Sequence, residues 1–241
     1  IQEQNSYPGL TNRILSKYAK KIFVAYDDMN KYFDNSQIII SGNPIRKSIK
    51  NTNKINKKKY LNSLGLNENL KTLLVLGGSL GAIQINEFVA KNLEFFKKNN
   101  LQVLLQCGTR YSKKYKFLDS TNIKVLPFIN EMDKAFSTAD IIISRSGASI
   151  ISELCLVGKP VVFIPSPNVA ENHQSKNARK LYNLGAAEYV EEDEVDYKLT
   201  SIISKILVSD IYRKSLSEKI KLLSKPNATK IIYNEIKDYL R

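Results

Sequence analysis

The chain has 241 residues, of which 43% are hydrophobic and 25% charged, so it is long enough to bury a substantial core in one large domain or two small ones. No apolar stretch approaches the roughly 20 residues that a membrane-spanning helix requires. Cys107 and Cys155 have no metal-ligand or redox spacing, which argues against a zinc motif and favours packing as small apolar side chains.

The formal net charge is +14, from 37 Lys and Arg residues against 23 Asp and Glu residues. Lys, Asn and Ile are all abundant and share A/T-rich codons, so the base composition of the genome accounts for part of the excess. The remainder would favour an anionic membrane surface or a phosphorylated substrate. A nucleic-acid partner is not expected, because no basic stripe with interleaved aromatic residues stands out.

The first part of the chain differs in pattern from the rest. PGLTNRILSKYAKK predicts a helix, residues 22–25 a strand, and SQIIIS a second strand, followed by a turn that contains Pro44. Residues 50–69 are rich in Lys and Asn and predict a solvated helix with a loop.

From residue 70 onward, short apolar runs alternate with longer amphipathic ones. The runs have the length and the Leu, Ile and Val content of buried parallel strands, at 70–78, 101–108, 123–128, 139–144 and 159–165. Helices are predicted between and after them, at 81–99, 111–117, 131–138, 148–157 and 171–184. Two later stretches, 199–207 and 227–241, also have helical spacing. The alternation predicts an α/β fold with a doubly wound, Rossmann-like parallel sheet.

This organisation predicts three parts. Residues 1–43 look like the tail of another domain, 44–225 form a complete Rossmann-like domain, and 226–241 form a C-terminal helix. Because the chain starts without Met inside a polar motif, we expect it to be an incomplete piece of a longer protein.

Ligands of open α/β sheets bind where strands lead into helix N-termini, and three such turns are rich in small and polar residues. The first is GGSLGA, at 77–82. Its glycines would let the backbone approach a phosphate or sugar, although it is neither G-x-G-x-x-G nor a P-loop. From its sequence alone, tight-turn geometry explains it equally well.

The second turn is SRSGAS, at 144–149, followed by Glu153. Its backbone N–H groups at a helix N-terminus predict an anion site to which Arg145 could add charge. Glu153 is placed to accept hydrogen bonds from a ribose diol. The alternative is ordinary helix capping by a serine, with Glu153 favourable to the helix dipole.

The third turn, SPNVAENHQSKNA at 166–178, contains the only histidine, His173. Gln174 and Asn177 lie on one helical face and would suit sugar hydroxyls, which need neutral donors and acceptors. A lone histidine is more often structural. No cluster has metal-ligand spacing, and no Ser-His-Asp arrangement or G-x-S-x-G elbow indicates a covalent hydrolase. The residues alone predict a nucleotide or nucleotide-sugar domain without a clear catalytic base and without a metal or other cofactor.

Several motifs in order resemble the MurG family of UDP-GlcNAc transferases: EQNSYPGLTNRIL, SGNPIR, LVLGGSLGA, SRSGASIISEL and GKPVVFIPSPNVAENHQSKNA. The resemblance covers most of residues 1–190. It implies the GT-B fold, with two Rossmann-like domains around a cleft. Here the donor domain would be complete, and only the C-terminal part of the acceptor domain, 1–43, would be present. The C-terminal helix would return towards the acceptor domain.

The resemblance also implies residue roles. The backbone of Ile129 would recognise uracil, and Glu153 would bind the ribose. The diphosphate would lie at Ser146, Gly147, Ala148, Ser149 and Ile150, bordered by Ser79 and Arg46. Gln174, with His173 and Asn177, would read the GlcNAc hydroxyls. Glu3, Gln4 and Asn5 match a cleft motif near the transferred sugar, in which Gln2 stands where the family usually has His.

The implied reaction is inverting transfer of GlcNAc from UDP-GlcNAc to lipid I, which gives lipid II in peptidoglycan synthesis. The implied place is the cytoplasmic face of the bacterial inner membrane, as a peripheral protein. The family's catalytic histidine belongs to a segment that this chain lacks, so no catalytic base is assigned and His173 does not take that role. The alternatives are the donor-binding subunit of a split transferase, with the other domain on a partner chain, or another GT-B enzyme such as a UDP-sugar epimerase.

Overall fold

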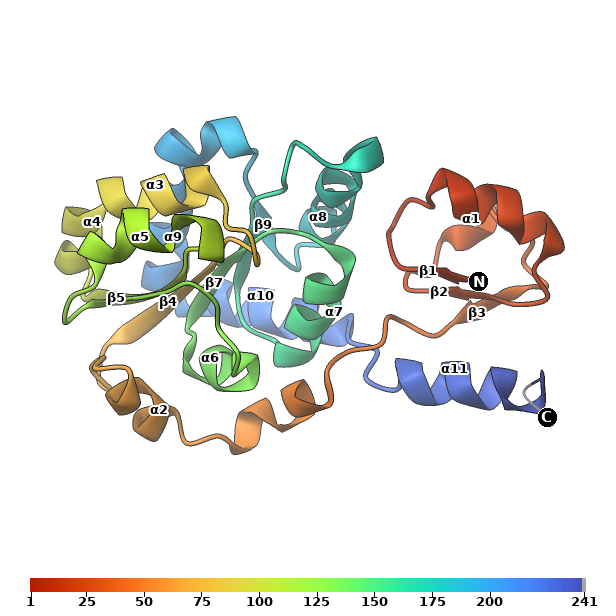
Figure 1. Ribbon diagram of the computed structural model, residues 1–241, viewed down its shortest axis with the longest axis horizontal. Coiled ribbons are helices and arrows are strands. Elements are labelled where there is room, and N and C mark those ends of the chain that lie inside the picture. The colour runs from red at the N-terminus through yellow and green to blue at the C-terminus, as the bar shows by residue number, and fades with distance from the viewer. Residues whose placement is uncertain (240–241) are drawn as a thin grey trace.

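The computed structural model describes residues 1–239, which form two lobes joined by two chain crossings (Figure 1). The larger lobe contains a six-stranded, wholly parallel sheet in the order β6-β5-β4-β7-β8-β9. Its strands are β4 (Lys71–Leu76), β5 (Leu101–Gln106), β6 (Ile123–Leu126), β7 (Ile141–Ser144), β8 (Val161–Phe163) and β9 (Glu188–Tyr189). This is the strand order of a doubly wound nucleotide-binding sheet, so the predicted fold class is confirmed.

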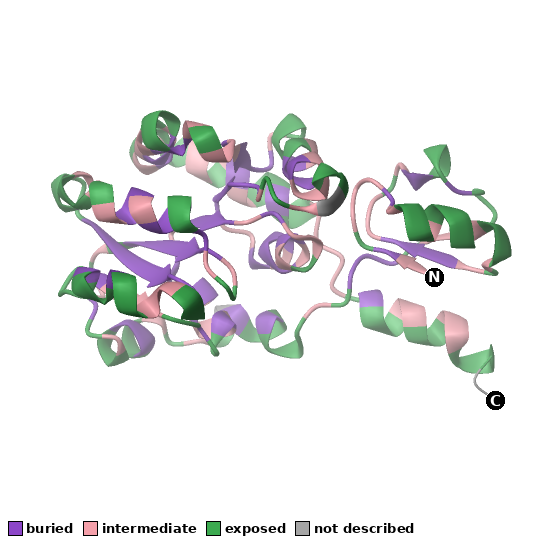
Figure 2. Cartoon of the chain, turned by 45° about the horizontal axis from the view of Figure 1, so that its top comes forward, coloured by how far each residue is buried: buried purple, intermediate pink, exposed green. Residues whose placement is uncertain are grey.

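Helices cover both faces of this sheet, and its strands are almost entirely buried (Figure 2). The larger lobe's α-helices are α2 (Lys57–Ser63), α3 (Ile83–Lys91), α4 (Leu93–Lys98), α5 (Ser112–Tyr115), α6 (Met132–Thr138), α7 (Ala148–Val157), α8 (His173–Asn183), α9 (Val195–Val208) and α10 (Asp210–Leu222). Two separate hydrophobic clusters, one on each face, form its core. The central strands β4, β5, β7 and β8 are mostly apolar because both of their faces are covered.

The smaller lobe contains a three-stranded parallel sheet and one α-helix. The sheet has the order β1-β2-β3, with β1 (Gln2–Glu3), β2 (Ile22–Val24) and β3 (Ile38–Ile40). Helix α1 (Leu10–Leu15) follows β1, and Ile22, Val24, Met29 and Phe33 form a small core. The smaller lobe thus has a parallel sheet of its own, separate from that of the larger lobe.

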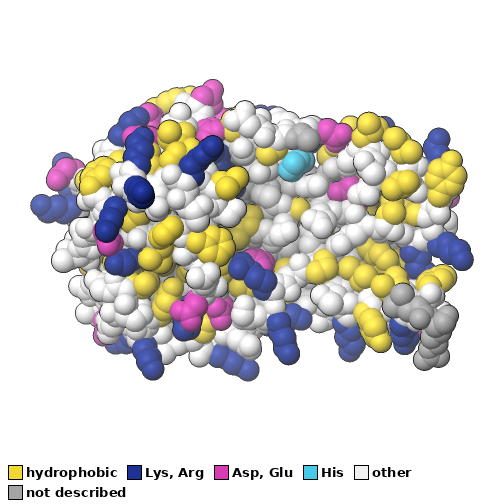
Figure 3. All heavy atoms as spheres, viewed as in Figure 1, with side chains coloured by type: hydrophobic (Ala, Val, Ile, Leu, Met, Phe, Trp, Pro, Cys, Tyr) yellow, Lys and Arg dark blue, Asp and Glu magenta, His cyan; other side chains and the backbone are white. Residues whose placement is uncertain are grey.

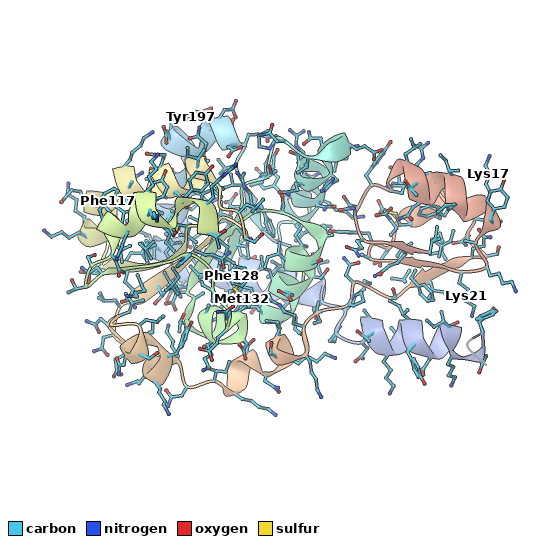
Figure 4. All side chains as sticks on the ribbon, viewed as in Figure 1. Lys17, Lys21, Phe117, Phe128, Met132 and Tyr197 are labelled. Carbon is cyan, nitrogen blue, oxygen red and sulfur yellow. The ribbon has the colours of Figure 1, made fainter. Side chains whose placement is uncertain are left out.

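The chain passes between the lobes twice, at 41–46 and again after α10. The crossings touch: a Cβ on Gly42, whose φ is +80°, would lie 2.5 Å from Cβ of Lys225. After the second crossing, α11 (Ala228–Ile236) lies beside the smaller sheet (Figure 1), where Lys21 forms an ion pair with Glu235. Lys21 lies between that sheet and α11 (Figure 4). Residues 240–241 of the predicted final helix lie outside the described residues.

Several details differ from the sequence predictions. The single helix predicted over 81–99 is two helices, because the side chain of Asn92 bonds the Phe88 carbonyl and interrupts the helical backbone. Helix α10 was not predicted, although Ser209 caps it by accepting from the N–H of Tyr212. Helix α2 is not wholly solvated, because Leu61 packs into the core. Within residues 1–239, no helix has both the length and the apolar character of a membrane span.

Asp140 connects three elements at the amino end of the larger sheet. It accepts a hydrogen bond of 2.8 Å from the N–H of Thr72 at the start of β4 and pairs with Lys57 of α2 at 3.1 Å. We expect Asp140→Ala to lower the free energy of unfolding by about 1–2 kcal/mol, measured by urea titration, because the Thr72 N–H loses its acceptor. Asp140→Asn keeps an acceptor and should cost less than about 1 kcal/mol. Equal losses for both variants would contradict this account.

Candidate functional site

The turns after β4, β5, β7 and β8 meet at the carboxyl edge of the larger sheet. The order of strands reverses between β4 and β7, which is where ligands of open α/β sheets bind. A cavity of about 170 Å³ lies there, which we call the donor cavity; its lining is Arg46, Leu76, Gly78, Gln106, Phe128, Met132, Ser144, Arg145 and Ile150. Phe128 and Met132 lie together at the centre of this lobe (Figure 4).

The glycine-rich turn after β4 fits both interpretations of its sequence, tight-turn geometry and an open approach for a ligand. Gly81 serves turn geometry: its φ is +86°, and a Cβ there would lie 2.2 Å from the carbonyl oxygen of Cys107. Gly78 also has a positive φ, +85°, but a Cβ on it would meet no atom within 4 Å. Beside it, Ser79 is exposed. The turn is therefore packed on the Gly81 side and open on the Gly78 side.

The N-terminus of α7 faces the same edge. Its N-cap residue is Gly147, and no side chain caps the helix, so the alternative of serine capping is wrong. A Cβ on Gly147 would also meet no atom within 4 Å. Because the first N–H groups of a helix lack intrahelical acceptors, the run from Gly147 to Ile150 presents donors and a positive dipole end. Ser146 is different: it is buried and its N–H already donates to Oε1 of Gln174 at 3.3 Å.

Glu153 and Arg46 contact each other directly. Arg46 Nε lies 2.6 Å from Glu153 Oε1, and Arg46 Nη2 pairs with Glu153 Oε2, which makes the interaction bidentate. The Glu153 side chain is only 7% exposed, whereas that of Arg46 is 47% exposed. The residues expected to bind ribose and diphosphate therefore neutralise one another in this conformation. The Glu153 carboxylate pairs with Arg46, whereas the alternative interpretation assigned it only a favourable interaction with the helix dipole.

Gln174, from the third turn, links two loops of the site through its side chain. Its Oε1 accepts from the N–H of Ser146 at 3.3 Å and from that of Ser166 at 3.0 Å, which joins the loops after β7 and β8. Its Nε2 is the other hydrogen-bonding group of this side chain. His173, the first residue of α8, lines a surface pocket together with Glu3 and Asn5. Figure 3 shows the histidine, in cyan, at the junction of the lobes.

The structure buries Asn177 between the two lobes. Asn177 is fully buried, and its Oδ1 accepts from the N–H of Ser6 at 2.8 Å while its Nδ2 donates to Oδ1 of Asn5 at 3.0 Å. In this conformation it joins the two lobes and does not face a sugar. Glu3 is likewise internal: it is 2% exposed and accepts from the N–H groups of Asn5 and Gly9 and from Asn12. Its carboxylate shapes the loop that follows β1.

Arg145 does not supply the free positive charge that the second turn predicts. Its Nη2 pairs with Glu192 at 2.6 Å, and its Nη1 donates to the carbonyl oxygens of Ile164 and Pro165. Both members of this ion pair are mostly buried, at 15% and 17% side-chain exposure. Arg145 therefore fixes the exit of β8, and Arg46 is the arginine in the donor cavity that is still half exposed.

Gln106, at the end of β5, was not singled out from the sequence. Its Oε1 accepts from the N–H of Ile129 at 2.9 Å, and its Nε2 donates to the carbonyl of Gly78 at 3.0 Å. Ile129 is 2% exposed, and of the backbone groups expected to recognise uracil its N–H already donates to Gln106. The sequence signal that could have identified Gln106 is a polar residue at the end of an apolar strand. Phe128, 44% exposed beside Ile129, was available from the same motif.

Comparison with known proteins agrees with this geometry. The model of the glycosyltransferase family 28 C-terminal domain matches residues 72–232, about two thirds of the chain. The chain belongs to glycosyltransferase family 28. Its match starts at β4 and includes every turn described above.

Relatives of this family 28 chain are close. A UDP-N-acetylglucosamine–N-acetylmuramyl-(pentapeptide) pyrophosphoryl-undecaprenol N-acetylglucosamine transferase of Flavobacterium psychrophilum is 45% identical over 98% of this chain and 64% of its own length. The protein of the same name from Parabacteroides distasonis is 43% identical over 98% and 65%. The crystal structure of Acinetobacter baumannii MurG matches with a TM-score of 0.76 and 28% identity, over 99% of this chain and 67% of that one.

These relatives confirm the resemblance to MurG and the partial GT-B fold. The family 28 chain spans about 64% of the length of its first curated relatives. A UDP-N-acetylglucosamine 2-epimerase structure also matches, with a TM-score of 0.63 but only 16% identity, which shows a common fold and no more.

Proposed function

We propose that this chain is the donor-binding part of an inverting glycosyltransferase that moves GlcNAc from UDP-GlcNAc to lipid I, giving lipid II. The observation that carries the proposal is the convergence of Arg46, Glu153 and the uncapped α7 N-terminus on one edge of the sheet. Membership of family 28 and 45% identity to the Flavobacterium psychrophilum N-acetylglucosamine transferase support the choice of donor and acceptor.

The parts of the donor would lie along this edge. Uracil would lie in the donor cavity beside Phe128, where the carbonyl of Ile129 would accept a hydrogen bond from its ring N–H. The diphosphate would lie at the N–H groups from Gly147 to Ile150, near Ser79. Departure of UDP increases the charge on the diphosphate, and preorganised helix N–H groups with an arginine stabilise such charge. Nε2 of Gln174, with His173 close by, would address the GlcNAc hydroxyls.

Binding of UDP would require an exchange of partners. In this structure Arg46 pairs with the Glu153 carboxylate, which we assign to binding of the ribose. We infer that Arg46 turns from Glu153 to the diphosphate when UDP enters, which frees Glu153 for the ribose hydroxyls. The exposed side of Arg46 permits such a movement, whereas buried Glu153 stays in place.

The domain assignment follows from the same proposal. Residues 44–225 would form the donor domain, 1–43 would belong to the acceptor domain, and 226–241 would brace the two. We assign no described residue as the base that deprotonates the acceptor hydroxyl. The enzyme would act as a peripheral protein at the cytoplasmic face of the inner membrane, where lipid I presents its headgroup.

Calorimetric titration of the chain with UDP and with ADP tests the donor assignment. We expect UDP to bind at least about tenfold more tightly than ADP, because one or two hydrogen bonds to uracil are worth about 1.4 kcal/mol or more. Equal affinities, or no binding of either, would overturn the assignment. Transfer of labelled GlcNAc to lipid I, with and without an added acceptor-domain polypeptide from a relative, then tests the reaction.

A further inference from the structure

A second and larger cavity lies at the hinge between the lobes. Its volume is about 410 Å³, and we call it the hinge cavity. Its walls come from the loop after β2, from both chain crossings, from α7 and from the ends of α8 and α10. It shares no lining residue with the donor cavity. Any molecule inside it would contact both lobes and both crossings.

The walls of the hinge cavity are mainly apolar. Ile151, Cys155 and Leu181 are buried, with exposures of 3%, 4% and 1%. At its edge, Leu184 is 52% exposed and Leu222 is 83% exposed. Pockets of about 300–1,000 Å³ with apolar walls and few polar groups are typical small-molecule sites.

The lining contains one buried polar atom without a hydrogen-bond partner among residues 1–239, and one tyrosine hydroxyl. Asn43 is 4% exposed; its Nδ2 donates to the Gln4 carbonyl and to Ser152, but its Oδ1 is buried without a hydrogen bond. Tyr26, whose ring centroid lies 4.9 Å from Nζ of Lys180, adds a hydroxyl to the lining. Burial raises the pKa of Tyr26, so the hydroxyl remains a donor at neutral pH. A buried polar atom without a partner costs free energy that a ligand can recover.

The charged residues of the lining cancel in pairs. Asp27 pairs with Lys225 at 2.9 Å, and Asp28 pairs with Lys180. The hydrogen bond to Lys180 holds the pKa of Asp28 below its usual value, against the opposing effect of desolvation, so this pair persists at neutral pH. The cavity therefore has no unpaired charge for an ionic ligand, and it favours an uncharged ligand.

We propose that the hinge cavity binds a small uncharged molecule, a ring system with mainly apolar surface and one N–H or O–H group. Its ring would contact Ile151, Cys155 and Leu181, and its polar group would reach the Tyr26 hydroxyl or the Asn43 amide. Occupancy would hold the two lobes at one relative angle, because the walls belong to both. This site does not depend on the proposed transferase function.

Titration of the chain with 5-fluoroindole, followed by ¹⁹F NMR, tests this proposal. We expect a dissociation constant of about 1 mM or tighter, the range for a ligand of about ten non-hydrogen atoms. N-methyl-5-fluoroindole lacks the N–H group and should bind at least about threefold more weakly. Neither compound carries a charge, so the comparison isolates the hydrogen bond.

Two variants place the binding at this cavity. Cys155→Met fills it from the α7 side and should weaken 5-fluoroindole at least about tenfold, and Tyr26→Phe should weaken it about threefold. The circular dichroism melting curve of each variant reports whether it is folded. Unchanged affinity in both folded variants, or equal affinity of the two indoles, would overturn the proposal. If UDP does not bind while 5-fluoroindole does, the proposed transferase function fails and the hinge site stands.

Discussion

Replacing Arg46 by methionine is expected to weaken UDP binding about 10–100-fold while changing uridine binding far less. If Arg46 moves to the diphosphate, its loss removes charge-assisted hydrogen bonds worth about 1.5–3 kcal/mol from UDP and none from uridine. Glu153→Gln should behave differently: it removes the charged acceptor of the ribose diol and should weaken UDP and uridine by similar factors. Calorimetric titration of each variant with both ligands measures the difference.

The same variants differ in stability. Arg46→Met leaves Glu153, at 7% side-chain exposure, as a buried carboxylate without its partner, so the free energy of unfolding should fall by about 2–3 kcal/mol. The value stays below that of a fully buried pair because Arg46 is half exposed. Saturating UDP should raise the free energy of unfolding of wild type and variant alike, because UDP binds only the folded chain.

A matched control is Arg213→Met in α10. Arg213 pairs with Asp210 and donates to the carbonyls of Ile206 and Leu207, remote from the donor cavity. Its loss should leave both ligand affinities unchanged. If Arg46→Met weakens uridine as strongly as UDP, the exchange of partners is wrong, and Arg46 acts only by holding Glu153.

The sequence was sufficient for β4 to β8 of the main sheet because each of these strands is a short apolar run between amphipathic stretches. It was insufficient where a polar side chain bonds the backbone and interrupts an element. Nothing local distinguishes Asn92, which splits the helix predicted over 81–99, from the other asparagines of this Asn-rich chain. The two-residue strands β1 and β9 are too short to show any periodicity.

The candidate site shows the same division. The three polar turns were found from their position after strands, and they meet at one edge because the strands are parallel. What each side chain does there depends on partners far away in the chain. Arg46 and Glu153 are 107 residues apart, and Ser6 and Asn177 are 171 apart. Spacing within a motif carries no information about such pairs, so the pairing of Glu153 and the burial of Asn177 could not be foreseen.

Gln106 couples the glycine-rich turn to the loop after β6, and its replacement should affect both stability and base recognition. In Gln106→Met the N–H of Ile129, which is 2% exposed, loses its acceptor, and the Gly78 carbonyl loses its donor. We expect the free energy of unfolding to fall by about 2–3 kcal/mol, since each unsatisfied buried group costs about 1–3 kcal/mol and Gly78 is partly accessible to water. The loop that places Ile129 and Phe128 would lose its attachment to the glycine-rich turn.

Gln102 of the same strand provides the matched control. It is fully buried, accepts from the N–H of Asn67 at 2.9 Å, and donates to the Asn67 carbonyl and to Thr72. Gln102 lies near the start of β5, away from the donor cavity. Gln102→Met should therefore lower the free energy of unfolding by a similar or larger amount, measured by urea titration. Only Gln106→Met should reduce the preference for UDP over ADP, by about tenfold, because only Gln106 fixes the backbone assigned to uracil. If both variants keep the same preference within about twofold, Gln106 stabilises the sheet edge without positioning the base-reading loop.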